Sequence, residues 1–355
     1  MKRQNTFLLF IFFSFLPLPF IIGMFNNTGG SLGAIWDVIS FVIVYVVAVL
    51  LFLMTFNYTE NISKDFFIYK LIWLQEMFII SGICGTFLGF VFTLQGMDLE
   101  PKPGTDISAT IISNFAIALI TLFYGVFAAT IVYLIQKFHE MKNDQTENSE
   151  VEKPKEGFLF SSMFCLILFI AIQLFVMFLG GRHTGGMGFL FSIENFGYII
   201  TVLIVLILFY KGNSFIDLIK NIFWYVSDTE KNIVYNLKYI RNMKKIAAMF
   251  ICISLICAPI VMLGALSYVP PEYNIVGWNN LPFVGLKNVT VQFLWVLEFI
   301  ILLTIIEGRE ASKLYFETGK ISAGDRFYSL KYILAPSFFL LFTVSFGVIL
   351  SFIAL

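Results

Sequence analysis

The amino-acid sequence predicts an all-α polytopic membrane protein with about nine transmembrane helices. Its composition is the first observation: 59% of the 355 residues are hydrophobic, 13% are charged, and 43 are phenylalanines. An ordinary soluble domain has about 25% charged residues, so the chain is too apolar for that class. The second observation is that the apolar residues fall into runs of about 20, the length an α-helix needs to cross a bilayer.

The apolar runs are expected to be helices, because inside lipid a helix satisfies all of its own backbone polar groups. The expected spans are residues 6–25, 36–56, 71–95, 110–136, 158–180, 194–210, 246–268, 289–307 and 332–354. The first run follows Lys2 and Arg3, as in a signal peptide. However, residues 25–28 offer no small-residue cleavage site, so we expect a retained helix.

The basic residues are divided unevenly between the expected loops, and this predicts the orientation. If the N-terminus is cytoplasmic, all of the 23 Lys and Arg residues except Lys102, Arg182 and Lys287 fall on the cytoplasmic side. Cytoplasmic loops of membrane proteins carry such an excess. We therefore expect a cytoplasmic N-terminus and, with nine spans, a C-terminus on the outside.

Small and hydroxylated residues line one face of each helix expected over 71–95 and 110–136. They recur at three- and four-residue steps, which places them one above another on a helix. The first stripe comprises Gly82, Gly85, Thr86, Gly89, Thr93 and Gly96. The second comprises Asn114, Ala118, Thr121, Gly125 and Ala128. Lipid tails give no hydrophobic attraction between helices, so such stripes indicate close helix packing or a polar path.

A weak internal repeat indicates a tandem duplication. Residues of the span near 289–307 match residues of the span near 110–136: Leu302, Thr304, Gly308 and Ala311 recur at the positions of Leu119, Thr121, Gly125 and Ala128. We therefore predict two four-helix units, joined by a cytoplasmic linker and followed by one additional helix. These regions are residues 1–140, the linker 141–157, a degenerate second unit 158–318, and 319–355.

The second unit has two notable features: an acidic residue inside an expected span, and a loop that combines aromatic residues with lysines. Glu298 lies near the centre of its span, where an ionisable side chain is a functional candidate by default. The alternative is a neutral Glu, hydrogen-bonded to neighbouring backbone or to Gln292. The loop 211–245 mixes aromatic residues with lysines, which predicts a helix lying on the inner membrane surface, either as an anchor or as a partner-docking segment.

The sequence gives no support for enzyme chemistry, a metal or a cofactor. Cys84, Cys165, Cys252 and Cys257 all fall in apolar runs, where cysteine acts as a small packing residue. His139 and His183 have no Cys, Asp or His at ligand spacing, and no hydrolase or nucleotide-binding motif occurs. The formal net charge is zero and no basic tract lies outside the loops, so nothing in the sequence indicates nucleic-acid binding.

Three strings in the first unit resemble one family. GGSLGAIWDVIS (29–40) resembles the first outside loop and second-helix start of MotA-type stator proteins. GICGTFLGF (82–90) is similar to the G-x-x-G-T-x-x-G helix of the MotA/TolQ/ExbB proton channel family, and AIALITLFYGVFAA (116–129) is similar to its A-x-A-L-x-T-x-x-Y-G helix. The strings occur in the family's order and on the matching spans, whereas the second unit resembles the family only faintly.

The resemblance implies an ion-driven (proton or sodium) stator or energy-transducing channel. It implies a ring of copies in the bacterial inner membrane, around the single helix of a MotB/TolR/ExbD-like partner that carries an intramembrane Asp. Thr86 matches the third-helix threonine, and Thr121 matches the first of two adjacent fourth-helix threonines, where Leu122 stands at the second position. With Glu298 and Thr304 of the second unit, these residues form the expected ion pathway.

One departure from the family pattern argues against a flagellar role, and one alternative function remains open. The loop 57–70 lacks the large cytoplasmic insertion with which MotA grips the flagellar rotor, so the chain is not expected to turn a flagellum. The alternative function is a non-conducting membrane scaffold derived from the same family. Both functions use glycine faces for packing, expected here at Gly82, Gly85, Gly89, Gly125 and Ala128.

Overall fold

The computed structural model describes most of six of the expected spans. The described residues are 37–55, 64–97, 107–142, 157–158, 160–183, 224–225, 230–267 and 281–318, with the single positions Ile200, Ile204, Leu334 and Ser337. Apart from those single positions, the expected spans 6–25, 194–210 and 332–354 lie outside this part of the chain. The nine-helix architecture therefore stays a prediction.

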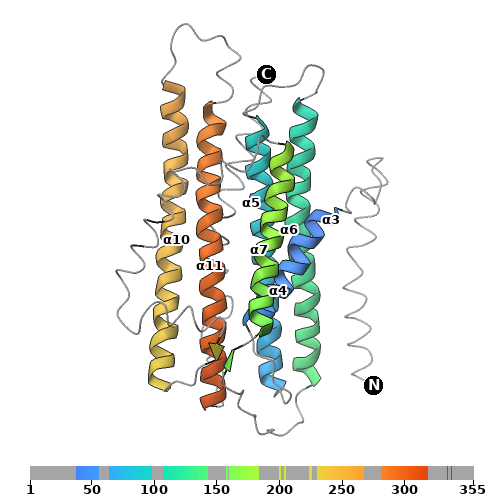
Figure 1. The fold of residues 1–355 in the computed structure, drawn as a ribbon, viewed down its shortest axis with the longest axis vertical. Helices are drawn as coiled ribbons and strands as arrows, with labels where there is room; N and C mark the ends of the chain where they lie inside the picture. Colours follow the sequence, from blue (N-terminus) through green and yellow to red (C-terminus); the bar gives the residue numbers. More distant parts are fainter. Residues whose placement is uncertain are drawn as a thin grey trace.

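The described residues are almost entirely helical, and the helices form an elongated bundle (Figure 1). The helices are α3 (Val38–Phe41), η2 (Val42–Val46), α4 (Val47–Thr55), α5 (Lys64–Met97), α6 (Ile107–Lys142), α7 (Phe160–His183), α10 (Glu230–Ser267) and α11 (Leu281–Thr318). The exception is a short antiparallel pair, β1 (Gly157–Phe158) with β2 (Trp224–Tyr225).

Four helical segments among the described residues are long and apolar enough to cross a membrane. They are Val38–Thr55, Phe66–Leu94, Phe115–Glu140 and Lys287–Thr318. The structure thus supports a helical membrane protein, as the composition predicts. The first segment runs without a break through α3, η2 and α4; its middle part, η2, is a single stretch of π-helix.

Two antiparallel hairpins, α5–α6 and α10–α11, make up most of the bundle. Within the α5–α6 hairpin, ring stacking joins Phe90 to Phe115 with centroids 4.9 Å apart. The second hairpin packs through α11 against α4 and α5, with α10 on the outside (Figure 1). The tandem duplication is not tested by this arrangement.

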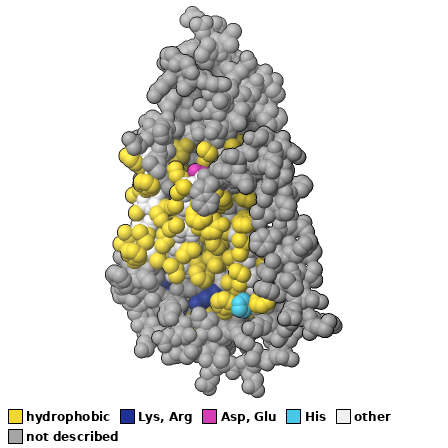
Figure 2. Space-filling model, turned by 90° about the vertical axis from the view of Figure 1, so that its right-hand side faces the viewer, with side chains coloured by type: hydrophobic (Ala, Val, Ile, Leu, Met, Phe, Trp, Pro, Cys, Tyr) yellow, Lys and Arg dark blue, Asp and Glu magenta, His cyan; other side chains and the backbone are white. Residues whose placement is uncertain are grey.

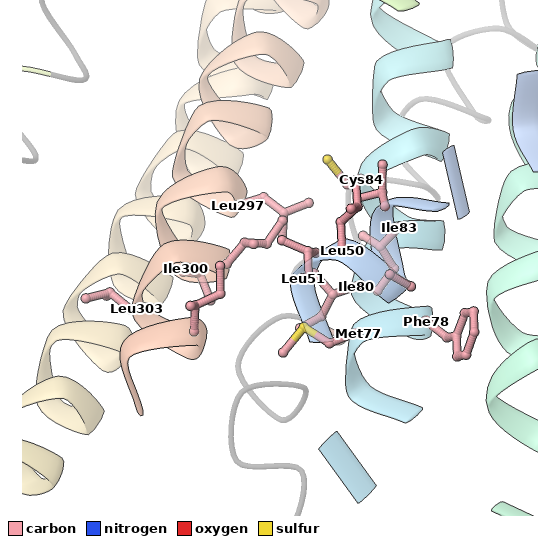
Figure 3. Packing of buried hydrophobic residues seen from close by; sticks show 14 of the residues in the cluster. Leu50, Leu51, Met77, Phe78, Ile80, Ile83, Cys84, Leu297, Ile300 and Leu303 are labelled. Atoms are coloured by element: carbon pink, nitrogen blue, oxygen red, sulfur yellow. The ribbon is translucent and has the colours of Figure 1, made fainter. Parts of the chain in front are cut away.

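The centre of the bundle is a buried apolar cluster that joins the two hairpins. Leu50 and Leu51 of α4, Ile80 of α5, and Leu297 and Ile300 of α11 all belong to it, and each is at most 6% exposed (Figure 3). Residues from α4 therefore fill the space between α5 and α11, so the two hairpins share one core.

The helix ends that the basic residues assign to the cytoplasm lie together at one end of the bundle. Phe67 at the start of α5 contacts His139 near the end of α6, with ring centroids 5.1 Å apart. Phe66 likewise stacks on Tyr315 near the end of α11 at 4.6 Å. The helices thus alternate in direction as the predicted topology requires. We call this end the inner end.

The side of the bundle formed by α6 is broadly apolar. Figure 2 shows this side covered with hydrophobic side chains, with basic and histidine side chains at one end. The exposed large residues of α6 are Ile117, Phe123, Val126, Phe127, Ile131, Tyr133, Ile135 and Phe138. A face of this kind requires lipid or another apolar helix against it.

Most of the aromatic part of the loop 211–245, on which the expected surface helix rests, lies outside the described residues, so the expectation stays a prediction there. A helix lying flat on the inner membrane surface is not observed over Glu230–Lys245, because these residues form the first turns of α10 and continue directly into its apolar part. Trp224 lies in β2. Residues 211–223 and 226–229 of the loop lie outside the described part of the chain. The lysines of this segment therefore stand on the same helix as the expected span 246–268.

Candidate functional site

Glycines allow α5 and α6 to approach closely along the predicted stripes. A Cβ atom added to Gly125 would lie 2.7 Å from the Phe78 carbonyl oxygen and 2.9 Å from Gly82 Cα. At Gly89 the added atom would lie 2.7 Å from Ala118 Cβ. Real Cβ atoms do not tolerate these distances, so the glycines permit backbone contact between the two helices.

Gly85 lies against a different neighbour. Its missing side chain leaves room for Thr121, one of the predicted ion-pathway residues. A Cβ there would lie 2.5 Å from Thr121 Cγ2 and 2.8 Å from Ile43 Cγ2. Ala128, one turn beyond Gly125, is 3% exposed. The small-residue stripes therefore form the contact surface between α5, α6 and the helix that contains η2.

Thr86 faces a small cavity between α5 and α6. Its hydroxyl donates to the Gly82 carbonyl oxygen at 2.7 Å, and its side chain is buried. The cavity has a volume of about 80 Å³ and is also lined by Leu122, Val126 and Ser337. The buried Ser337 hydroxyl has no hydrogen-bond partner within the described part of the chain. The exposed surface of this cavity is apolar.

Thr121 belongs to a polar group that joins α6 to the start of α3. Its hydroxyl lies 3.0 Å from Ser40 Oγ and 3.3 Å from the Ile117 carbonyl oxygen. Asp37 is the N-cap of α3, because its Oδ2 accepts a hydrogen bond from the Ser40 backbone N–H at 2.8 Å. The Asp37 N–H in turn donates to the Tyr124 hydroxyl at 3.3 Å.

This group lies near the middle of the bundle's height, because Tyr124 is close to the midpoint of α6 (Ile107–Lys142). The expected span 36–56 places Asp37 at the edge of the membrane, because Asp37 is the second residue of that span. The signal that could have found it is the Asp-x-x-Ser spacing before an apolar run, which marks a helix N-terminus.

Glu298 and Thr304 lie in two further, separate environments on α11. Glu298 Oε1 accepts a hydrogen bond from the Cys84 thiol of α5, with sulfur and oxygen 3.2 Å apart. This contact with the neighbouring hairpin was not among the partners expected from the sequence. The fully buried Thr304 donates to the Ile300 carbonyl oxygen of its own helix at 2.8 Å. The predicted ion-pathway residues thus do not converge on one site.

A buried ionic cluster, which no expectation from the sequence included, joins α10 to α11 at the inner end. Both oxygens of Glu307 are engaged: Oε1 accepts from Arg241 Nε at 2.9 Å, and Oε2 accepts from Lys244 Nζ. The Lys244 and Glu307 side chains are only 1% and 5% exposed. Buried charges are stable only when paired in this way.

The cluster continues along α11, where the neighbouring Arg309 reaches α4. Glu310 accepts from Lys313 at 2.8 Å and from Asn236 of α10 at 3.1 Å. The buried Arg309 donates through Nε to the Met54 carbonyl oxygen of α4 at 2.7 Å. The sequence signal was the three-residue spacing of Glu307, Glu310 and Lys313, which puts them on one helix face. Glu307 is the last residue of the expected span 289–307, whereas Glu310 and Lys313 fall in the expected loop after it, so the span boundary divides the cluster.

Together, the apolar helices, the glycine contacts and the buried polar groups define a polytopic helical membrane protein. No group of three or more His, Cys, Asp or Glu side chains that could hold a metal ion occurs among the described residues. Comparison with protein-family models, with curated proteins and with solved structures finds no match to this chain. The resemblance to the MotA/TolQ/ExbB family therefore rests on the three sequence strings.

Proposed function

We propose that this chain is a subunit of an ion-driven energy-transducing complex of the bacterial inner membrane, with protons or sodium as the ion. The observation that carries the proposal is the polar group of Asp37, Ser40, Thr121 and Tyr124 near the middle height of the bundle. Ionisable and polar groups are costly at this depth, and in membrane proteins they mark ion paths.

Two buried hydroxyls, those of Thr86 and Ser337, lie beside the cavity that Leu122 and Val126 also line. The surface of this cavity is apolar and it is partly open, so Thr86 supports the proposal only as a buried hydroxyl next to the glycine stripe.

The arrangement of the hairpins supports a ring in which only the first hairpin lines the axis. The second hairpin covers the side of α4 and α5 that lies away from α6 (Figure 1), whereas the α6 face remains apolar and exposed. We propose that copies of the chain assemble through this face around a single-helix partner that carries an intramembrane Asp. The second hairpin then forms an outer layer.

A non-conducting scaffold is the second candidate, and one observation favours it. The hydroxyls of Thr86, Thr121 and Thr304 all make hydrogen bonds within the chain. Bonds to the preceding turn are common for threonine in membrane helices and require no ion. In a scaffold these residues would serve packing alone.

Ion uptake in cells that express the chain with its single-helix partner tests the channel. Asp37→Asn removes the charge but retains an N-cap side chain of equal quality, so the helix start is preserved. We expect this variant and Thr86→Ala to lower uptake without lowering the amount of protein in the membrane. Thr130→Ala is the matched control, because Thr130 makes the same bond to its preceding turn at 2.8 Å but is exposed.

If Asp37→Asn, Thr86→Ala and Thr121→Ala all leave uptake at the level of the control, the channel is excluded and the scaffold takes its place. Native mass spectrometry of the detergent-solubilised complex tests the assembly independently. Several copies with a small co-purifying membrane protein are expected. A strict monomer without such a partner would contradict the ring.

A further inference from the structure

A basic groove runs along the inner end of α10, next to the buried ionic cluster, with which it shares Arg241. It has a volume of about 350 Å³ and is lined by the polar side chains of Lys238, Arg241, Asn242 and Lys245. Its apolar lining comes from Val234 and Leu237 of α10 and from Leu314 of α11. This volume is within the range of ordinary small-molecule sites.

Three of the residues that line the groove, Lys238, Arg241 and Lys245, are basic. Among the described residues, the carboxylate of Glu307 binds Arg241 and also Lys244. Lys238 and Lys245 add two further positive charges on exposed side chains. Because the bond to Glu307 holds Arg241 in place, its guanidinium is a preorganised part of the groove, and guanidinium groups are well suited to phosphate.

The basic residues form one stripe that continues into the apolar part of α10. Val234, Lys238, Arg241, Lys245 and Met249 follow at steps of three and four, which places them on a single helix face. Lys238 and Lys245 are about 10 Å apart along the helix axis. Met249, just beyond the start of the expected span, is 64% exposed.

We propose that this groove binds the phosphate group of an anionic ligand, and that the ligand is a phospholipid of the inner leaflet. Basic pockets between membrane helices on the cytoplasmic side bind anionic lipid headgroups. The apolar continuation of the stripe at Met249 favours a lipid over a soluble phosphate compound, because an acyl chain extending from the headgroup would lie along it. The proposal is independent of ion conduction.

The test uses the full-length chain purified in detergent. Phosphatidylglycerol or phosphatidylcholine is added in mixed micelles, and bound lipid is measured by native mass spectrometry. Phosphatidylglycerol is expected to be retained in preference to phosphatidylcholine. Lys238→Gln with Lys245→Gln is expected to weaken its binding roughly 30-fold, since one lysine at an anionic surface accounts for about a five-fold change. Lys238→Gln alone is expected to weaken it about five-fold.

Lys231→Gln is the matched control, because Lys231 is an exposed lysine of the same helix that does not line the groove. It should bind phosphatidylglycerol as the unchanged protein does. In a second experiment, glycerol phosphate is added to the protein with bound phosphatidylglycerol. If the lipid stays bound, the ligand is the phospholipid. If glycerol phosphate displaces it fully, the groove is a phosphate site for a soluble ligand. Equal retention of both lipids, or an equal loss in the control and the double variant, would overturn the proposal.

Discussion

Removing the Glu307 carboxylate is expected to destabilise the protein more than removing either of its cationic partners. In Glu307→Leu, the Lys244 ammonium keeps its charge at a site where its side chain is 1% exposed, but loses the carboxylate that balances it. Breaking a buried ion pair from one side costs about 3–5 kcal/mol of the free energy of unfolding. We expect a loss in this range.

The converse substitution, Lys244→Met, is expected to cost less. Glu307 would still accept the hydrogen bond from Arg241 Nε at 2.9 Å, and Arg241 is 27% exposed. One charge-assisted hydrogen bond is lost, which corresponds to about 2 kcal/mol. In the double variant, Lys244→Met with Glu307→Leu, neither buried charge of the pair remains. Its loss is expected to be about 1 kcal/mol, because well-packed apolar replacements for buried pairs are often close to neutral.

The assay is a titration of the protein in mixed micelles with SDS, followed by circular dichroism to obtain the free energy of unfolding. Lys137→Met on α6 is the matched control, because Lys137 pairs with Glu140 at 2.6 Å but the side chains are 42% and 28% exposed. Exposed pairs contribute about 0–1 kcal/mol, so this control should be close to neutral. Equal losses in the two single variants, additive in the double variant, would refute the pairing argument.

Two further predictions concern helix packing and topology. Gly125→Ala is expected to lower the free energy of unfolding by about 1–3 kcal/mol, because the added Cβ would meet the Phe78 carbonyl oxygen at 2.7 Å. The control in the same titration is Val126→Ala on the exposed face of α6, which should lower the free energy of unfolding much less. In intact cells, a membrane-impermeant thiol reagent is expected to label a cysteine placed at Thr28 but not one at Asn148, and the opposite result would invert the predicted topology.

The position of each described helix was largely predictable, but its length was not. A window of about 20 apolar residues detects the part of a helix that contacts lipid. It does not detect polar turns that continue the same helix beyond the bilayer. For this reason the expected span 246–268 lies in a helix that begins at Glu230, and 289–307 lies in one that ends at Thr318.

The glycine stripes show what a local pattern can and cannot reveal. Spacing alone placed Gly82 and Gly89 on one face of a helix, and that face does contact α6. Spacing could not show that Thr121 would bond to Ser40 or that Cys84 would bond to Glu298, because these partners are distant in the sequence. Such contacts depend on how the helices rotate and shift when they pack.

By itself, then, the sequence determined that this is a helical membrane protein, where the six described spans run, and which helix faces carry small residues. These properties follow from hydropathy and helical periodicity, which are local. Only the tertiary structure decided that Asp37 lies beside Tyr124, and that Glu307 is buried between Arg241 and Lys244. The physical reason is that a polar side chain in an apolar bundle must find a partner, and the packing of distant helices determines which partner is within reach.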